Sequence, residues 1–303
     1  MSGSPARGRA GGKVILLGEH AVVYGRPAVA TGLPLGIEAE ALRDAGPRLE
    51  SDVVPGDARG EALVAQAAEA LALDPRRWVV RVCSDLPPGQ GLGSSAALCV
   101  AVLRALAAAA GRRLERDEEL DLGRRLEGIF HGTPSGIDPA AAALGTTFRF
   151  VRGDPPLVER LVPGAPMVIV VAPGDVPRST GAAVGGLRER RQAERARYEA
   201  LFDAVAEVVE EGIRALCRGD ATALGAAFDR NQTLLERMGV SSPEIERRVA
   251  AARVAGALGA KLTGGGVGGA VIALVDDEHE AAVTNAVRQQ AAAAFRIRIA
   301  GVP

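Results

Sequence analysis

The chain has 303 residues, with 36 Lys plus Arg, 37 Asp plus Glu and a formal net charge of −1. This length can bury the cores of two medium-sized domains, and the balanced charge argues against nucleic acid or an anionic membrane as a partner. The 3 cysteines lack the spacing of a disulfide framework or a zinc site, and no apolar run would span a bilayer. We expect a soluble cytoplasmic protein with a loose N-terminus over residues 1–12.

The predicted elements mix strands and helices without strict alternation, which favours an α+β fold. In chain order they are strands at Lys13–Leu17, Gly36–Leu42 and Trp78–Cys83, helices at Ser94–Ala110 and Asp117–Phe130, and a strand near Thr146–Val151. The proline-rich run Arg152–Pro166 is interpreted as a connector. A strand at Met167–Ala172, helices within Thr180–Cys217, Ala221–Met238 and Ser242–Leu258, a strand at Ala270–Val275, a helix at Glu278–Ala294 and a strand at Phe295–Ala300 follow. We predict two domains, 1–164 and 165–303.

The segment Leu86–Ala97, LPPGQGLGSSAA, is the most informative motif. Its three glycines free a short turn of Cβ atoms, so backbone N–H groups can curl around an anion. The helix that starts at Ser94 adds unpaired N–H donors and the positive end of a dipole. No Gly-Lys-Ser/Thr follows, so this is not a Walker A loop. We predict a phosphate site in which the hydroxyls of Ser94 and Ser95 reach the phosphate or its metal ion; the alternative is a plain flexible turn.

Two lysines, Lys13 and Lys261, stand among 36 basic residues, and each lies beside a glycine-rich segment. Bias toward arginine codons explains most of this usage. However, a compact ammonium cannot be replaced freely by a wide, planar guanidinium in a tight site. We therefore expect both lysines to be functional.

Two further segments place polar residues at the ends of predicted elements. Gly18-Glu19-His20 follows a short apolar strand, and polar residues at the end of a strand commonly line a site. The alternative is an ordinary turn with a satisfied histidine. In EGIFHGTPSGID, a constrained turn delivers Asp138 to the start of a helical stretch, where it is either a helix cap or an acceptor for a substrate proton. Glu127 is suited to Mg²⁺, which prefers oxygen ligands, whereas His131 is interpreted as packed or capping.

The C-terminal run Lys261–Gly269, KLTGGGVGG, formally contains GxGxxG. We reject a dinucleotide site because the run precedes a strand and does not link a strand to a helix. Close approach of its backbone to a ligand or to the other glycine loop is the better account. Val176–Thr180, VPRST, opens a long helix, and its Arg178 and Thr180 are placed to contact an anion.

Together these motifs resemble the superfamily of small-molecule kinases that includes galactokinase, homoserine kinase, mevalonate kinase and phosphomevalonate kinase, known as the GHMP kinases. PPGQGLGSSAA resembles their shared ATP-binding signature and KLTGGGVGG their C-terminal glycine motif. KVILLGEHAVVYGRPA, HGTPSGID and VPRST are most similar to mevalonate kinases. The resemblance implies an S5-like N-terminal domain, a ferredoxin-like C-terminal domain and a site between them. It also implies phosphorylation of mevalonate by ATP with Mg²⁺.

The same resemblance assigns roles to matching residues. Asp138 would be the catalytic base and Lys13 its neighbour, while Ser95 and Glu127 would hold Mg²⁺. The residues expected to bind ATP are Pro88, Gly89, Gly91, Leu92, Gly93, Ser94, Ser95, Ala96, Gly264 and Gly266. Those expected to bind or support the substrate are Glu19, His20, Ser135, Thr180 and, for its carboxylate, Arg149 first and Arg152 second.

The chain departs from the family pattern at Val267, where glycine is usual, so that either the position has ordinary β geometry or the loop is rearranged. It is also short between Glu50 and Trp78, a region that normally helps to hold adenine, and no adenine contacts are assigned. Two alternatives stay open: a sister kinase for phosphomevalonate or another small alcohol, and a non-catalytic ligand sensor. A homodimer and feedback inhibition by isoprenoid diphosphates also stay open.

Overall fold

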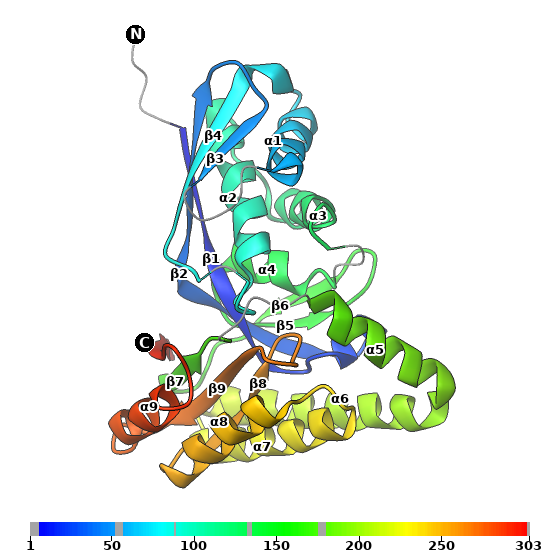
Figure 1. Ribbon diagram of the computed structural model, residues 1–303, viewed down its shortest axis with the longest axis vertical. Coiled ribbons are helices and arrows are strands. Elements are labelled where there is room, and N and C mark those ends of the chain that lie inside the picture. Colours follow the sequence, from blue (N-terminus) through cyan, green and yellow to red (C-terminus); the bar gives the residue numbers. More distant parts are fainter. Residues whose placement is uncertain (1–5, 52–56, 88, 132–134, 175–179, 302–303) are drawn as a thin grey trace. The chain divides into compact units, whose positions relative to one another are not determined.

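The computed structural model describes residues 6–51, 57–87, 89–131, 135–174 and 180–301, with side chains from residue 185 onward in the last range (Figure 1). The chain forms two compact units. Unit 1 comprises residues 1–13, 32–88 and 93–145, and unit 2 comprises residues 14–31, 89–92 and 146–303. The strands β1 (Ala6–Leu17) and β2 (Ala28–Arg43) each contribute residues to both units.

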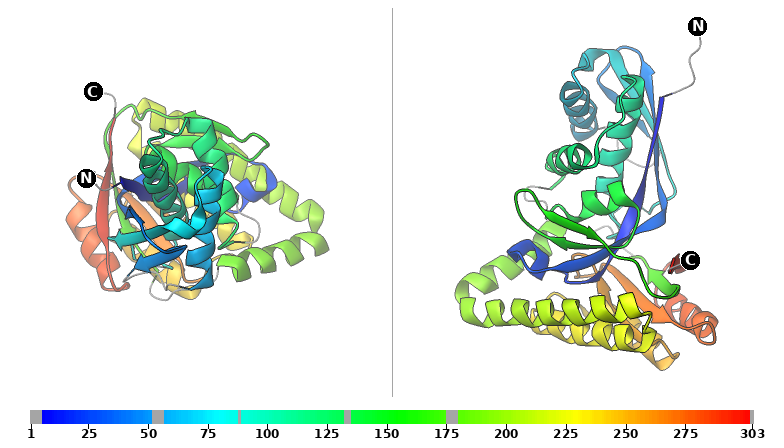
Figure 2. Two further views of the ribbon diagram at one scale, coloured as in Figure 1. Left: turned by 90° about the horizontal axis from the view of Figure 1, so that it is seen from above. Right: turned by 180° about the vertical axis from the view of Figure 1, so that it is seen from behind.

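Unit 1 is a sheet covered by helices. Strand β4 (Trp78–Ser84) lies between β3 (Arg48–Ser51) and the second half of β2, and β1 also pairs with β2. The helices α1 (Ala58–Ala70), α2 (Ser94–Ala109), α3 (Arg116–Glu127) and α4 (Ile137–Leu144) lie on one side of this sheet (Figures 1 and 2). The alanine-rich α2 packs against the other three, and its residues from Ala96 to Leu103 are all buried. This central position fixes the start of α2, which is where the glycine-rich segment ends.

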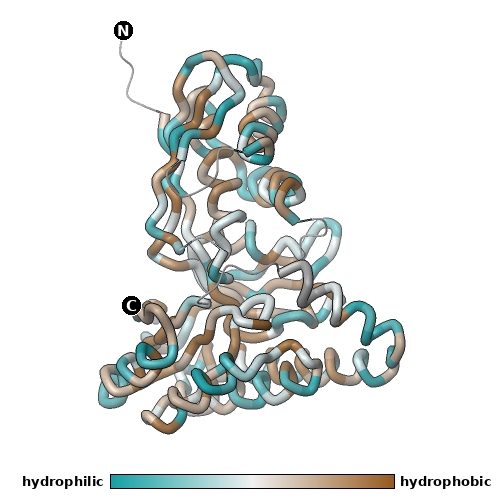
Figure 3. Tube along the Cα trace, viewed as in Figure 1, coloured by the Kyte–Doolittle hydropathy of each residue, from teal (hydrophilic) through white to brown (hydrophobic). Residues whose placement is uncertain are grey.

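Unit 2 contains a four-stranded antiparallel sheet. Its strands β7 (Met167–Ala172), β8 (Gly259–Thr263), β9 (Ala270–Val275) and β10 (Phe295–Ile299) are ordered β10-β7-β9-β8. Every residue of β7, β8 and β9 is buried, and the hydrophobic residues of these strands are brown in Figure 3. With helices between β7 and β8 and between β9 and β10, this is the ferredoxin-like arrangement. The predicted α+β class is therefore confirmed.

The helices of unit 2 pack against the sheet and against one another. Helices α7 (Ala221–Arg237) and α8 (Pro243–Val254) contact β8, and α9 (Glu280–Arg288) contacts β7. Helix α6 (Arg195–Arg218) packs on α7 and follows α5 (Thr180–Ala193). Outside this layer, β5 (Phe148–Val151) pairs with Ala28–Ala30 of β2 and with β6 (Leu157–Arg160).

The expected loose N-terminus is wrong for residues 6–12, which lie in β1. The segment looks like a loop because it is rich in glycine, but glycine here allows close packing. A Cβ atom on Gly8 would lie 2.3 Å from the carbonyl oxygen of Ala101 in α2, so this strand passes α2 too closely for any side chain. Ala10, between the glycines, is buried.

Other elements were not predicted. The interpreted connector Arg152–Pro166 contains β6, which pairs antiparallel with β5. Helix α1 and the short strands β3 and β8 are also new, as are the one-turn helices η1 (Ala21–Tyr24) and η2 (Pro75–Arg77). The domain boundary at residue 164 stays a prediction. Among the described residues, no helix is both long enough and apolar enough to cross a membrane.

The three cysteines differ in exposure. Cys83, in unit 1, and Cys217, in unit 2, are exposed, whereas Cys99 is buried in α2. Burial, with the nearby Glu127 carboxylate adding to it, raises the pKa of the Cys99 thiol well above its usual value. Cys99 therefore stays a neutral thiol at physiological pH.

Val267 does not have the ordinary β geometry that was the first of the two expectations for this position. Its φ is +45°, in the left-handed region, and its N–H donates a hydrogen bond of 3.0 Å to the carbonyl of Val240. A β-branched residue is strained there, at a cost of about 1–2 kcal/mol relative to a conformation with negative φ.

Replacing Val267 by glycine should relieve this strain. We expect Val267→Gly to raise the free energy of unfolding by about 1 kcal/mol, which corresponds to roughly 2 °C in a chain of this size. Thermal and chemical denaturation would measure the change. Val267→Ala keeps a Cβ atom and should give no comparable gain; an equal gain in both variants would show that the strain is not the cause.

Candidate active site

In unit 1, an ion pair joins Lys13 to Asp138. The Lys13 Nζ lies 3.2 Å from the Asp138 Oδ1, with the lysine side chain 5% exposed and the aspartate side chain 25% exposed. The helix cap of α4 is Gly136, with φ +87°, so Asp138 lies in the first turn and is not the cap. The carboxylate is thus held by a cation while part of it stays accessible. The same turn places the Ser135 Oγ 3.4 Å from the Ile137 N–H.

Glu127 is the last residue of α3 and is 3% exposed. Burial raises the pKa of its carboxyl well above the usual value, the negative charge of Asp138 raises it further, and Lys13 lowers it. Glu127, Asp138 and Lys13 therefore act on one another electrostatically within unit 1. A further cation beside these two carboxyl groups would favour the ionised form of Glu127.

The start of α2 is left open by the residues before it. Its cap is Gly93, with φ +77° and no side chain to satisfy the first N–H groups of the helix. A Cβ atom on Gly93 would also lie 2.8 Å from the Lys13 Cγ, so a larger residue would displace the lysine. Gly93 thus leaves the start of α2 without a side-chain cap and makes room for the Lys13 side chain.

Of the serines that begin α2, Ser95 has a described partner. Its Oγ lies 3.1 Å from the His131 Nε2. The interpretation of His131 as packed or capping agrees with this contact. Ser95 was predicted as a ligand for Mg²⁺, and this role stays a prediction, as do the ATP contacts assigned to the loop. Pro88 lies outside the described residues.

In unit 2, a second lysine and carboxylate are paired without any exposure. Lys261, on β8, forms an ion pair with the Glu19 Oε1, and both side chains are 0% exposed. The Asn231 Nδ2, from α7, donates a hydrogen bond of 2.9 Å to the Glu19 Oε2. Glu19 was predicted to line a substrate pocket; in the structure its carboxylate takes part in this internal cluster, and its role at the substrate stays a prediction.

His20 follows Glu19 and is 5% exposed. Burial lowers the pKa of its ring to about 4, a contact with the Gly265 backbone opposes this, and the charges of Arg190 and Lys261 lower it further. The ring is therefore neutral at physiological pH. Its Nε2 is buried and has no hydrogen-bond partner among the described residues. A neutral imidazole with a free nitrogen is suited to bind a hydroxyl or carboxylate group.

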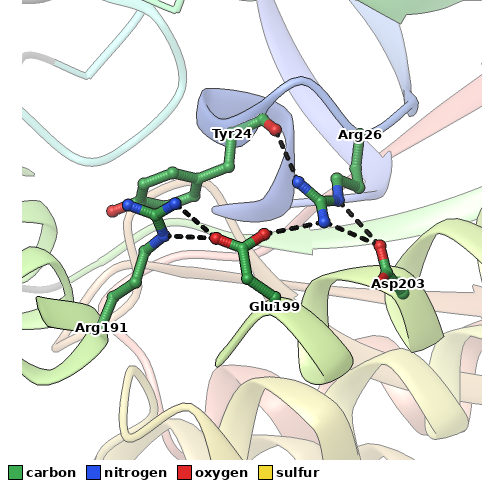
Figure 4. A network of polar contacts seen from close by, with 5 residues as sticks. All are labelled: Tyr24, Arg26, Arg191, Glu199 and Asp203. Carbon is green, nitrogen blue, oxygen red and sulfur yellow. Dashed lines mark hydrogen bonds and ion pairs between the residues drawn. The ribbon is translucent and has the colours of Figure 1, made fainter. Parts of the chain in front are cut away.

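Helix η1, directly after His20, is held by a network that the sequence did not reveal (Figure 4). Arg26 lies 2.8 Å from both Glu199 and Asp203, which belong to α6. Arg191 contacts Glu199 and lies 4.6 Å from the centre of the Tyr24 ring. These residues connect η1 to α5 and α6 within unit 2. They fix the segment that carries His20.

The two arginines proposed for the substrate carboxylate differ in their contacts. Arg149 donates from both Nε and Nη2 to the Glu210 Oε1, at 3.2 and 2.8 Å. Arg152 donates from Nη1 to the carbonyl of Val23 in η1, at 2.8 Å. Arg149, the first choice, thus pairs with a carboxylate, whereas Arg152 contacts a backbone carbonyl; the role of either arginine at the substrate stays a prediction.

The C-terminal glycine run turns between β8 and β9. Gly264 and Gly266 have φ of +79° and +66°, and a Cβ atom on Gly266 would lie 2.0 Å from the carbonyl oxygen of Val240. The run is therefore packed tightly against the α7–α8 corner. Thr180 begins α5, but its side chain and Arg178 lie outside the described part of the chain.

Comparisons with known proteins agree with this organisation. Residues 62–146 match the family description "GHMP kinases N terminal domain", and residues 213–293 match "GHMP kinases C terminal". The mevalonate kinase of Pyrococcus furiosus is 34% identical, with 90% of each chain covered. The chain belongs to the GHMP kinases. The resemblance predicted from the motifs is thereby confirmed.

Further relatives of this GHMP kinase are also mevalonate kinases. The mevalonate kinase of Aeropyrum pernix is 34% identical, with 97% of this chain and 96% of that protein covered. The crystal structure of L. major mevalonate kinase in complex with R-mevalonate is 28% identical, covers 99% of this chain and 97% of that one, and has a TM-score of 0.84. The mevalonate kinase structure from methicillin-resistant Staphylococcus aureus is 30% identical, covers 98% and 99%, and has a TM-score of 0.73.

The buried carboxyl of Glu127 should cost stability. Because its pKa is raised in the folded protein, the folded state retains a proton that the unfolded state releases, so the free energy of unfolding falls as pH rises above about 4.5. We expect Glu127→Gln to remove this slope and to unfold at an equal or higher temperature than the wild type at pH 7.

Melting temperatures from pH 5 to 8 would measure this effect. Glu119→Gln is the matched control, because Glu119 lies on the same helix but pairs with Arg104 at 2.5 Å. Its replacement should lower the melting temperature. A similar loss in both variants would contradict the prediction for Glu127.

Proposed function

We propose that this GHMP kinase transfers the γ-phosphoryl group of ATP to the C5 hydroxyl of (R)-mevalonate, giving 5-phosphomevalonate and ADP. The single observation that carries the chemistry is the pair formed by Lys13 and Asp138, 3.2 Å apart. The choice of acceptor is supported by two mevalonate kinases that are 34% identical and by the similar structure of L. major mevalonate kinase in complex with R-mevalonate.

Asp138 is suited to receive the proton of the acceptor hydroxyl. A primary alcohol is a poor nucleophile at neutral pH, and a carboxylate that takes its proton as the P–O bond forms contributes roughly 10²–10⁴-fold. The Lys13 ammonium beside it neutralises negative charge that develops on the alcohol and on the transferred group. Phosphoryl transfer otherwise depends on positioning, which the neighbouring helix end and glycine loop are suited to supply.

The phosphates of ATP would lie at the glycine loop. The open first turn of α2 offers N–H groups without competing side-chain caps. Residues proposed for these contacts are Gly89, Gly91, Leu92, Gly93, Ser94, Ser95, Ala96, Gly264 and Gly266. Pro88 belongs to the same proposal but lies outside the described residues.

The residues in unit 1 fit Mg²⁺. In the described part of the chain, no three His, Cys, Asp or Glu side chains gather as a protein-only metal cage, and Mg²⁺ is normally held by one or two carboxylates together with substrate phosphates. Burial and the negative charge of Asp138 raise the pKa of Glu127, so a cation beside this carboxyl would favour its ionised form. We propose that Glu127 and the Ser95 hydroxyl hold the ion. When bound, Mg²⁺ would neutralise phosphate charge.

On the acceptor side we propose His20, through its free Nε2, with Ser135 and Thr180 in supporting roles. Arg152 is proposed for the carboxylate. The boundary between domains at residues 164 and 165 is also proposed, since the two family matches fall on either side of it. A homodimer and a cytoplasmic location stay predictions.

Replacing Asp138 by asparagine tests the mechanism. We expect Asp138→Asn to fold and bind ATP as the wild type does, but to lose roughly 10²–10⁴-fold in turnover because the amide cannot take the proton. Coupled ADP release, calorimetric ATP binding and melting temperature would measure the three properties. Wild-type turnover in this variant would remove Asp138 from its proposed role.

The same assay separates the alternatives when it is run on mevalonate, phosphomevalonate, homoserine and galactose. Turnover of another alcohol without turnover of mevalonate would favour a sister kinase. Ligand binding without any turnover would favour a sensor.

The two arginines can be compared directly. We expect Arg152→Gln to raise the KM for mevalonate by roughly 10- to 100-fold with little effect on the KM for ATP, because a charge-assisted hydrogen bond contributes about 1.5–3 kcal/mol. Arg149→Gln breaks the contact with Glu210 and should mainly lower the melting temperature. Steady-state kinetics of both variants would decide, and the opposite pattern would restore Arg149.

A further inference from the structure

The backbone at His20 is strained. His20 has φ +62° and ψ −47°, and the Ala21 N–H donates a hydrogen bond of 2.7 Å to the carbonyl of Glu19. These dihedral angles and this i+2 to i bond define the rarer kind of γ-turn, which has positive φ. A histidine in this conformation persists only where surrounding contacts fix it. The contacts that fix this turn are therefore part of how the imidazole is presented.

The strongest of these contacts reach Glu19, whose carbonyl closes the turn. Its carboxylate is held on one oxygen by Lys261 and on the other by the Asn231 Nδ2, at 2.9 Å. Neither ionic side chain is exposed to solvent. Glu19 lies just after β1, whereas Lys261 is on β8 and Asn231 is on α7. Two separate elements therefore hold the residue that precedes the histidine.

Strand β8 also contacts β1 at a second point, through hydrogen bonds between Thr263 and Ile15. Thr263, two residues after Lys261 and thus on the same face of β8, is fully buried. Its Oγ1 accepts a hydrogen bond of 2.8 Å from the Ile15 N–H and donates one of 2.9 Å to the Ile15 carbonyl. Ile15 precedes the turn by several residues. Thr263 therefore provides a natural control, because it ties the same two strands without touching the turn.

The chemistry of the site requires a lysine. The Lys261 Nζ also donates to the Leu262 carbonyl at 2.5 Å and lies 5.9 Å from the centre of the Phe228 ring. A compact ammonium fits this enclosed space, whereas a guanidinium would bring five N–H donors into a space that is already closed. This accounts for one of the two lysines in a chain that otherwise uses arginine.

We propose that Lys261 is a positioning residue: together with Asn231 it anchors Glu19, and so holds the γ-turn that presents His20 to the acceptor substrate. The part of this inference that concerns the substrate rests on the proposed function. The part that concerns the anchor does not, because it is a property of the free protein.

The anchor can be tested without substrate. The double variant Glu19→Gln/Lys261→Met removes both charges, so that no unpaired carboxylate stays buried. The full-length protein, labelled in its histidine rings, has three histidine signals, and His20→Gln assigns one of them. At pH 7 we expect the His20 signal of the double variant to shift and broaden. We also expect the rate of amide exchange to increase at Ala21 by a factor at least ten times larger than the factor at Ile15.

Thr263→Val should show the reverse pattern, with faster exchange at Ile15 and an unchanged His20 signal. If the double variant and Thr263→Val lose melting temperature equally and leave the His20 signal in place, Lys261 is only structural and the proposal is overturned. Should the double variant fail to fold, Asn231→Ala removes only the second contact to Glu19 and is read by the same two signals.

The kinetic arm addresses the substrate. We expect the double variant to raise the KM for mevalonate at least tenfold, with the KM for ATP within twofold of the wild type. A shifted His20 signal with an unchanged KM for mevalonate would overturn the link to the acceptor. Absence of turnover with mevalonate in the wild type would refute the proposed function instead, while the ring signal and amide exchange still decide whether the anchor exists.

Discussion

A charged side chain that is shielded from water needs an opposite charge beside it, and this requirement shapes the two lysine–carboxylate clusters of this protein. Lys13 pairs with Asp138 in unit 1, and Lys261 pairs with Glu19 in unit 2. Removing one partner from a buried pair costs about 3–5 kcal/mol, because the other charge is left without compensation. Each pair therefore fixes the backbone segments that contribute to it. One such segment leads into α4, and the other leads into the His20 turn.

The two pairs differ in what they leave accessible. The Asp138 side chain keeps a quarter of its surface exposed, and the nearby Glu127 adds a second carboxyl with a raised pKa. In this cluster, two carboxyl groups lie near a single ammonium, so the negative charge is not fully compensated. The Lys261 pair is closed to solvent and has a further hydrogen bond from Asn231. It is suited to hold structure and not to react.

Local motifs placed the predicted site residues in the fold well, because these residues lie in contiguous turns; their roles stay predictions. Gly93 and the start of α2 could be placed from the glycine-serine pattern alone, and Asp138 from the turn before it. The partners of Glu19 could not be predicted, since Asn231 sits within an ordinary helix and Lys261 is 242 residues away in sequence. The strand at residues 6–12 was missed because its glycines are typical of a loop. In the structure, Gly8 instead allows the strand to pass close to α2.

The placement of the thiols offers a practical way to label this enzyme at two defined positions. Cys83 and Cys217 are exposed and belong to different units, while Cys99 is shielded within α2 and its thiol resists ionisation. Maleimide dyes would thus attach at one position on each unit of the unaltered protein and spare the third. Energy transfer between a donor and an acceptor dye would then report the distance between the two labelled positions, with no engineered cysteine.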